Sequence, residues 1–357
     1  MPTTPLIAAL AVICVSPSGG TPAGEFCRTT IQAAVNVARP GTLIRVLPGV
    51  YVEAVVVPPR KDGIQIVGTG PDATLVDGAG GTAAITVRSA DVEIRDLGVR
   101  NAIIGVSLQA PHGTVSGLKS GAGIGVGIAG TGSESAAHQI LSNDVQGIAV
   151  FGPDLLVRDN RVRGELTVSG ERGSAIGNQV EGGRLNVFGT VFGETVTVRA
   201  NRVHGAPDVG IQVLARNPVV EGNVVSQARS GLNVGCLIRV FEDPDACLQG
   251  SISDNIVTDT ITDGLIVLAS SPGLPVRRNR VERAGRGVVL VGRGLLAQGN
   301  RALGNLGAGI AVLGGSVDTV VTGNIALANH PDFCDDGVGT VLSNNTFGTV
   351  GPCFVQP

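Results

Sequence analysis

The chain has 357 residues, of which 54 are glycine and only 3% are aromatic, and it contains no tryptophan. The 43% of hydrophobic residues is enough to build a large core, which excludes intrinsic disorder. The formal net charge is only −3, which argues against nucleic acid as a partner, because phosphate binding needs a concentrated basic surface.

The N-terminal segment, residues 1–11, has two interpretations. It begins an apolar run and ends in Ala9-Leu10-Ala11, which resembles a signal-peptide cleavage site, but residues 1–5 carry no positive charge. We therefore expect either a truncated signal segment ending at Ala11 or the first strand and turn of the fold. The run is too short to span a membrane, so no membrane span is expected.

The next element is a short amphipathic helix followed by strands. One apolar face is formed by residues at helical spacing, namely Ile31, Ala34, Val35 and Ala38. Thr29 with Gln32 fits a capping box, and Pro40-Gly41 ends the helix. Alternating aliphatic residues then predict strands within 43–47 and 52–57. One helix followed only by short strands indicates a cap, over about 12–42, on a β structure.

The six cysteines form three pairs that are close in sequence. Local disulfides are the natural interpretation: Cys14–Cys27, Cys236–Cys247 and Cys334–Cys353. Metal ligation is the alternative, but there is no C-x-x-C motif and the four histidines lie far from the cysteines in sequence. Disulfides imply an extracytoplasmic location: secreted, cell-surface or periplasmic.

From residue 143 onward a phrase recurs about every 22 residues: asparagine, a hydrophobic residue, a variable stretch, and then an alternating strand such as "GIQV". Its asparagines are Asn143, Asn160, Asn178, Asn201, Asn223, Asn255, Asn279, Asn300, Asn324 and Asn345. Such a unit cannot bury an apolar face alone, but stacked coils can, and the asparagines would then form an internal ladder. One long interval predicts an inserted loop closed by a disulfide at 236–247.

This repeat and the opening "TTIQAAVNVARPGTLIRVLPGVYVEAV" resemble the right-handed parallel β-helix proteins of the pectate-lyase-like superfamily. The resemblance covers almost the whole chain and implies an all-β solenoid, residues 12–357, as a single domain and a monomer. In that family the turn before the second strand usually reads Pro-Gly-Asp, where this chain has Thr42, whereas Gly49, Tyr51 and Glu53 match. The fold hosts lyases, hydrolases, epimerases and non-catalytic binders, so it does not by itself define a function.

In the enzymes of this family the substrate lies along one sheet. The outward positions of the corresponding strands here are uncharged, and their middle section is polar: Thr167, Asn186, Gln212 and Asn233. We expect these four residues to bind substrate. An apolar stripe of Ile266, Val289 and Ala311 should follow. The shortage of aromatic residues argues against a deep sugar-binding cleft.

Charged candidates precede this strand. Asp263 and Arg286 each come directly before the strand glycine, so we expect them on adjacent coils. Asp259 or Asp263 would act as a general base while Arg286 neutralises a uronate carboxylate. A surface salt bridge without catalytic role is the alternative.

Calcium is the cofactor that such enzymes most often use, although no cofactor is required by the sequence. Two acidic, turn-like segments could supply oxygen ligands: Glu242, Asp243 and Asp245, and then Asp332, Asp335 and Asp336. Neither has the spacing of a known calcium motif. The sequence thus predicts a secreted β-helix that binds extracellular or envelope polysaccharide, or alternatively a lyase, epimerase or hydrolase acting on an acidic glycan.

Overall fold

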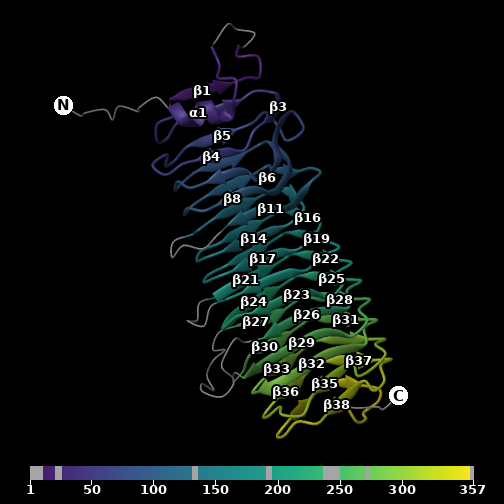
Figure 1. Ribbon diagram of the computed structural model, residues 1–357. Coiled ribbons are helices and arrows are strands. Elements are labelled where there is room, and N and C mark those ends of the chain that lie inside the picture. Colours follow the sequence, from purple (N-terminus) through teal and green to yellow (C-terminus); the bar gives the residue numbers. More distant parts are fainter. Residues whose placement is uncertain are drawn as a thin grey trace, which may run out of the picture. The chain divides into compact units, whose positions relative to one another are not determined.

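The computed structural model describes residues 11–20, 26–130, 136–189, 195–235, 250–270 and 273–353. Two compact units are formed, Met1–Gln146 and Gly147–Pro357, and both are parallel β-solenoids with coils of about 22 residues (Figure 1). The expected loop and disulfide at 236–247, and residues 1–10 of the expected signal segment, lie outside the described residues. The single-domain organisation stays a prediction.

The first unit contains the one helix of the described chain and thirteen strands. Its first row of parallel strands is β1 (Val12–Val15), β2 (Leu43–Val46), β5 (Gln65–Val67), β7 (Glu93–Arg95), β9 (Thr114–Ser116) and β12 (Gln139–Leu141). The other strands are β3 (Gly49–Val52), β4 (Val55–Val57), β6 (Thr74–Val87), β8 (Gly98–Leu108), β10 (Lys119–Ser120), β11 (Ile124–Gly130) and β13 (Asp144–Val145).

The helix α1 (Ile31–Val37) contacts β1, β2 and β4 through the predicted apolar face. The expected capping box is wrong: the N-cap is Thr30, whose hydroxyl accepts the N–H of Ala33. Gln32 instead bonds the backbone of Val56 through both ends of its amide. The carboxylate of Glu53 accepts the N–H groups of Ile31 and Gln32 at 2.7 and 2.8 Å, which satisfies two free donors of the helix terminus.

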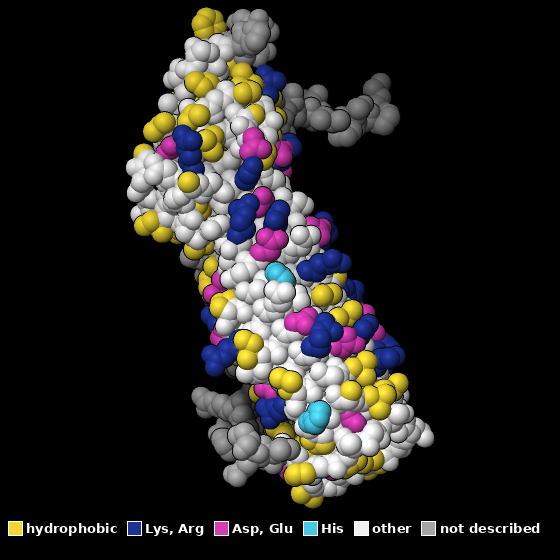
Figure 2. All heavy atoms as spheres, turned by 90° about the vertical axis from the view of Figure 1, so that its right-hand side faces the viewer, with side chains coloured by type: hydrophobic (Ala, Val, Ile, Leu, Met, Phe, Trp, Pro, Cys, Tyr) yellow, Lys and Arg dark blue, Asp and Glu magenta, His cyan; other side chains and the backbone are white. Residues whose placement is uncertain are grey.

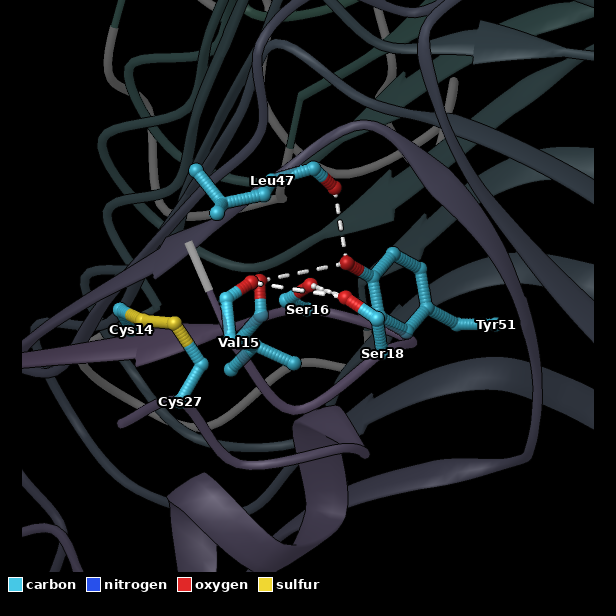
Figure 3. Close-up of a disulfide and its surroundings, with 8 residues drawn as sticks. Cys14, Val15, Ser16, Ser18, Cys27, Leu47 and Tyr51 are labelled. Carbon is cyan, nitrogen blue, oxygen red and sulfur yellow. Dashed lines mark hydrogen bonds between the residues drawn. A yellow bond between two sulfur atoms is a disulfide. The ribbon is translucent and has the colours of Figure 1, made fainter. Parts of the chain in front are cut away.

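Tyr51 links the first two coils beside the predicted Cys14–Cys27 disulfide, which is present (Figure 3). Its hydroxyl donates to the carbonyl oxygens of Leu47 at 2.8 Å and Val15 at 3.3 Å. Burial, and then the neighbouring charge of Glu53, raise the pKa of Tyr51 to about 12. The tyrosine and glutamate of the opening motif are therefore explained by structure alone.

The second unit repeats one pattern of three strands per coil. The first row is β15 (Leu156–Arg158), β18 (Ser174–Ile176), β21 (Thr195–Arg199), β24 (Asn217–Glu221), β27 (Ser251–Ser253), β30 (Pro275–Arg277), β33 (Leu296–Gln298), β36 (Val320–Thr322) and β39 (Val341–Ser343). The second row is β16 (Arg161–Val162), β19 (Gln179–Glu181), β22 (Arg202–His204), β25 (Val224–Ser226), β28 (Ile256–Thr258), β31 (Arg280–Glu282), β34 (Arg301–Leu303), β37 (Ile325–Leu327) and β40 (Thr346–Phe347).

The third row is β14 (Ile148–Phe151), β17 (Leu166–Ser169), β20 (Leu185–Phe188), β23 (Val209–Leu214), β26 (Ser230–Gly235), β29 (Asp263–Ser270), β32 (Arg286–Arg293), β35 (Ile310–Val312) and β38 (Phe333–Asp335). Each strand pairs in parallel with its equivalent in the next coil, and valine, isoleucine, leucine and alanine side chains fill the interior. Strands of the three rows follow one another down the lower part of Figure 1.

The predicted asparagine ladder lies in the turn between the first and second rows. One residue at positive φ precedes each asparagine, as Ala200 does at 55° before Asn201. The Asn201 side-chain oxygen accepts both the backbone and the side-chain N–H of Asn178, and its own amide donates to the carbonyl of Ala175. The same bonds repeat from coil to coil, so the ladder satisfies buried backbone groups where the chain turns.

A second, shorter ladder was not predicted. It lies in the turn after the second row, where Asn305 accepts the N–H of Ala284, Asn329 accepts from Asn305, and Asp332 ends the series. The predicted Cys334–Cys353 disulfide lies nearby, at a Cα separation of 4.9 Å.

Candidate functional site

The predicted polar ladder is continuous on the third row of strands. The backbone register pairs Thr167 with Asn186, Asn186 with Gln212, and Gln212 with Asn233. It then continues into the apolar stripe of Ile266, Val289 and Ala311. The relative positions of all seven residues were therefore predicted correctly, while their role in binding stays a prediction.

The four polar ladder residues differ in accessibility. Thr167 and Asn186 are only 9% and 2% exposed, whereas Gln212 and Asn233 are half-buried. The expected outward apolar stripe is also largely closed, because Val289 and Ala311 are buried. At least for Ala311 the cause is visible: it belongs to a cluster with Cys334 against which Cys353 packs.

Thr167 and Asn186 both point their donors at a charged neighbour. The Thr167 hydroxyl and the Asn186 amide donate to the same carboxylate oxygen, Oε1 of Glu165, at 2.9 and 2.7 Å. This contact fixes the orientation of the Asn186 amide, because the flipped amide would place its oxygen against the carboxylate. The Asn186 oxygen is then buried without a hydrogen-bond partner among the described residues. These two ladder residues thus position Glu165.

Glu165 is one of two charged residues at this site, with Arg184, that sequence reasoning missed. Its other carboxylate oxygen, Oε2, lies 3.4 Å from Nε of Arg184, and Nη1 of Arg184 lies 3.8 Å from Asp208. Glu165 and Arg184 are two residues before Thr167 and Asn186, so they share the outward face. In the following coils a glycine occupies this position, as at Gly210. That exception to the repeat is the signal that could have revealed them.

An apolar column, interrupted by Ser169 and Gly235, runs beside the polar ladder, two residues further along the strands. It contains Phe151, which is 44% exposed, Phe188, Leu214 and Leu268, which is 49% exposed. The register places Phe188 directly next to Leu214. Two of the eight phenylalanines therefore lie on this face, which an overall shortage of aromatic residues did not suggest.

Asp263 and Arg286 lie on adjacent strands, as expected. They are partners in the register of β29 and β32, and Arg286 contacts both oxygens of Asp263, at 2.5 and 3.1 Å. Their side chains are 13% and 34% exposed. Asp263 thus lies at the start of β29 in a bidentate ion pair with Arg286.

Asp259 is not joined to that pair by any hydrogen bond of the described residues; it binds Arg283 instead. Arg283 contacts both of its carboxylate oxygens, at 2.7 and 3.0 Å, and these hydrogen bonds hold the pKa of Asp259 below its ordinary value. A carboxylate held in this way binds a proton weakly, which opposes a role as general base. The catalytic roles of Asp259, Asp263 and Arg286 stay predictions.

Of the two acidic segments considered for calcium, Glu242, Asp243 and Asp245 lie outside the described residues. Asp332 is buried and already accepts hydrogen bonds from Asn329, Gly348 and Thr349. Burial raises the pKa of Asp332, but these hydrogen bonds outweigh it and leave the pKa lowered. Asp335 accepts from Gly337 and Thr340. Within the described part of the chain, no three acidic, histidine or cysteine side chains group as metal ligands.

Acidic and basic side chains also gather on the side of the molecule that carries the second row, as Figure 2 shows. There they form exposed ion pairs, for example Arg161 with Glu181. No helix among the described residues is long and apolar enough to cross a membrane.

Comparison of the sequence finds no matching family model and no matching curated protein. Solved structures do match. The catalytic unit of a GH87 α-1,3-glucanase from Streptomyces thermodiastaticus aligns with a TM-score of 0.59 and 13% identity, over 99% of this chain and 72% of that one. The A-module of a mannuronan C-5 epimerase from Azotobacter vinelandii aligns with a TM-score of 0.43 and 15% identity, over 92% and 91%.

Carrot pectin methylesterase aligns with a TM-score of 0.32 and 13% identity, over 75% of this chain and 84% of that one. At these identities a likeness shows the fold alone, and of these three structures the glucanase has the highest TM-score. The coil pattern, the asparagine ladder and this likeness define a right-handed parallel β-helix. The chain has the pectate-lyase-like fold, as the opening motif and the repeat predicted.

Proposed function

We propose that this protein is a secreted β-helix that binds a polysaccharide along the third row of its second unit. The observation that carries the proposal is the polar ladder lying in register beside the apolar column of Phe188 and Leu214. Sugars present hydroxyl edges and apolar ring faces, so a polar row next to an apolar one matches both. The shared fold with an α-1,3-glucanase supports a polysaccharide as the class of ligand.

Within the ladder, Gln212 and Asn233 are the residues that meet the ligand. Both are half-buried and keep hydrogen-bonding capacity toward solvent, whereas Thr167 and Asn186 are turned toward Glu165. Asn233 accepts the hydroxyl of Ser230 at 3.1 Å, which leaves its amide N–H groups available.

The alternative is a lyase or epimerase with its site at Asp259, Asp263 and Arg286. The adjacency of Asp263 and Arg286 favours it, since a base and a cation are what uronate chemistry needs. Their mutual bidentate contact opposes it, because each group already satisfies the other. Binding is therefore the better-supported function.

Secretion rests on the disulfides. Cys14–Cys27 and Cys334–Cys353 persist only in an oxidising compartment, which favours an extracytoplasmic location. We also propose that α1 closes one end of the first unit, since Ile31, Ala34 and Val35 are buried against the first coils and would otherwise leave strand edges open.

The test is affinity electrophoresis of the purified, oxidised protein in gels that contain one polysaccharide each. Replacing Gln212 and Asn233 together by alanine should weaken retention at least about tenfold, because two hydrogen-bonding groups are lost from a partly desolvated face. The matched control replaces Gln179 and Gln298, outward glutamines of the second and first rows, and should leave retention unchanged.

The same samples are assayed for ultraviolet absorbance of unsaturated products. A product signal that is lost in Asp263→Ala and kept in the ladder variant would replace the binding proposal by the lyase alternative. Equal retention of the ladder and control variants would also overturn the proposed binding face.

A further inference from the structure

Glu165, Arg184 and Asp208 form a charge-compensated unit on the proposed binding face. Besides Arg229, Arg184 is the one cation on the outward positions of β14, β17, β20, β23 and β26 and the two positions before them. It lies between two carboxylates, with Nε 3.4 Å from Glu165 and Nη1 3.8 Å from Asp208. At Arg184 an acidic sugar would therefore meet a positive charge that two carboxylates already compensate.

The orientation of Glu165 toward Arg184 is enforced. Thr167 and Asn186 both donate to its oxygen Oε1, so Oε2 is the oxygen left for Arg184. Asn186 holds this arrangement although its own oxygen is buried without a partner among the described residues. The two donors that hold Glu165 are thus kept at the cost of one unpaired buried acceptor.

The alternation of charge continues on the next coil. Arg229 follows Asp208 in the register, because Val209 pairs with Ser230. Neighbouring charges along this edge thus have opposite signs, from Glu165 through Arg184 and Asp208 to Arg229. Alternating charges cancel at the distance of a bound sugar chain, especially at physiological salt.

We propose that the binding face selects a neutral glycan and rejects an acidic one, with Glu165 and Asp208 masking Arg184. This inference rests on the proposed function and names the substrate class of the same face. Hydroxyl groups of a neutral sugar would bind Gln212 and Asn233, while a ring face would pack on Phe188. A uronate or sulfate would gain no attraction from Arg184, because Glu165 and Asp208 already neutralise its charge.

The test is a double substitution that unmasks the arginine. Glu165→Gln combined with Asp208→Asn removes two negative charges and replaces both carboxylates by amide groups of similar size. Its matched control is Glu181→Gln with Glu221→Gln, which removes two carboxylates from exposed ion pairs with Arg161 and Arg199 on the other rows. Both doubles change the net charge of the protein equally.

Retention is measured on neutral probes, dextran, laminarin and mannan, and on acidic probes, polygalacturonate, alginate and hyaluronan. The wild-type protein should be retained by at least one neutral probe and by none of the acidic ones. At low salt the Glu165→Gln/Asp208→Asn variant should be retained by the acidic probes about five- to tenfold more strongly than the wild-type protein. This gain should disappear at high salt. The control double should show no gain.

Each other outcome has a definite meaning. Wild-type retention by acidic probes alone would overturn the selection of neutral glycans and leave the proposed binding function standing. Equal gains in the two doubles would overturn the masking of Arg184, because net charge alone would explain them. Retention by none of the six probes would overturn the proposed function and this inference with it.

Discussion

The asparagine ladder should contribute most of its stability in the middle of the second unit. Asn201 is fully buried and its side chain makes four hydrogen bonds, two accepted from Asn178, one donated to Ala175 and one donated to Asn223. Asn201→Ala removes all four. The Asn178 amide keeps its bond to Val157, but the Asn178 backbone N–H is left buried without an acceptor.

The expected loss follows from these counts. At roughly 1 kcal/mol net for each hydrogen bond, and more for the donor left unpaired, Asn201→Ala should lower the free energy of unfolding by about 3–5 kcal/mol. The control is Asn345→Ala at the last rung. Asn345 is half-buried, so water replaces the bonds it makes with Asn324 and Val321, and the expected loss is about 1 kcal/mol.

Both losses are measured by guanidinium denaturation monitored by circular dichroism. They follow from the shift of the denaturation midpoint, with one common slope of unfolding free energy against denaturant concentration. Similar losses in the two variants would contradict this expectation, because burial would then have no influence on the stability that a rung contributes. A loss of under about 1 kcal/mol in Asn201→Ala would also contradict it, since the ladder would then not satisfy the buried backbone.

Two further predictions concern stability. Burial, followed by the nearby charge of His112, lowers the pKa of His138 to about 4, below its unfolded value of 6.5. The unfolded chain therefore binds the proton first as pH falls, and the free energy of unfolding should drop by about 3 kcal/mol between pH 6.5 and 4. Over this range the denaturation midpoint should fall less in His138→Leu than in the wild-type protein. An equal fall in the two proteins would contradict the assignment of this pH dependence to His138. Gly292 has a φ of 141°, and a Cβ there would overlap the carbonyl oxygen of Ala269, so Gly292→Ala should destabilise by over about 3 kcal/mol. Gly315→Ala, at φ 89° in open space, should cost only about 1–2 kcal/mol, and equal melting temperatures of the two variants would refute the steric argument.

Much of the fold could be predicted because it is locally repetitive. Each coil carries its own asparagine and its own alternating strand, so the period alone aligns residues that are far apart in sequence. The pairing of Gln212 with Asn233 followed from taking the outward position between the two inward hydrophobic residues of each strand. The cysteine pairs Cys14–Cys27 and Cys334–Cys353 followed from proximity along the chain.

Features that break the repeat could not be predicted in the same way. Glu165 and Arg184 replace a glycine at the start of their strands. Because the strands were aligned on that glycine, these two residues were left out of the predicted outward face. The bond from Glu53 to α1 spans 22 residues, whereas a capping box at Thr29 uses only local sequence. Asn305 and Asn329 form a ladder of too few rungs to stand out as a period.

The central claim is that the third row of the second unit binds a neutral glycan. Its most direct test is a crystal structure of the protein with a neutral oligosaccharide from the probe that retains it. We expect a sugar ring packed on Phe188 with hydroxyl groups within hydrogen-bonding distance of Gln212 or Asn233. An oligosaccharide ordered instead beside Asp259 and Arg283, or on the first or second row, would contradict it.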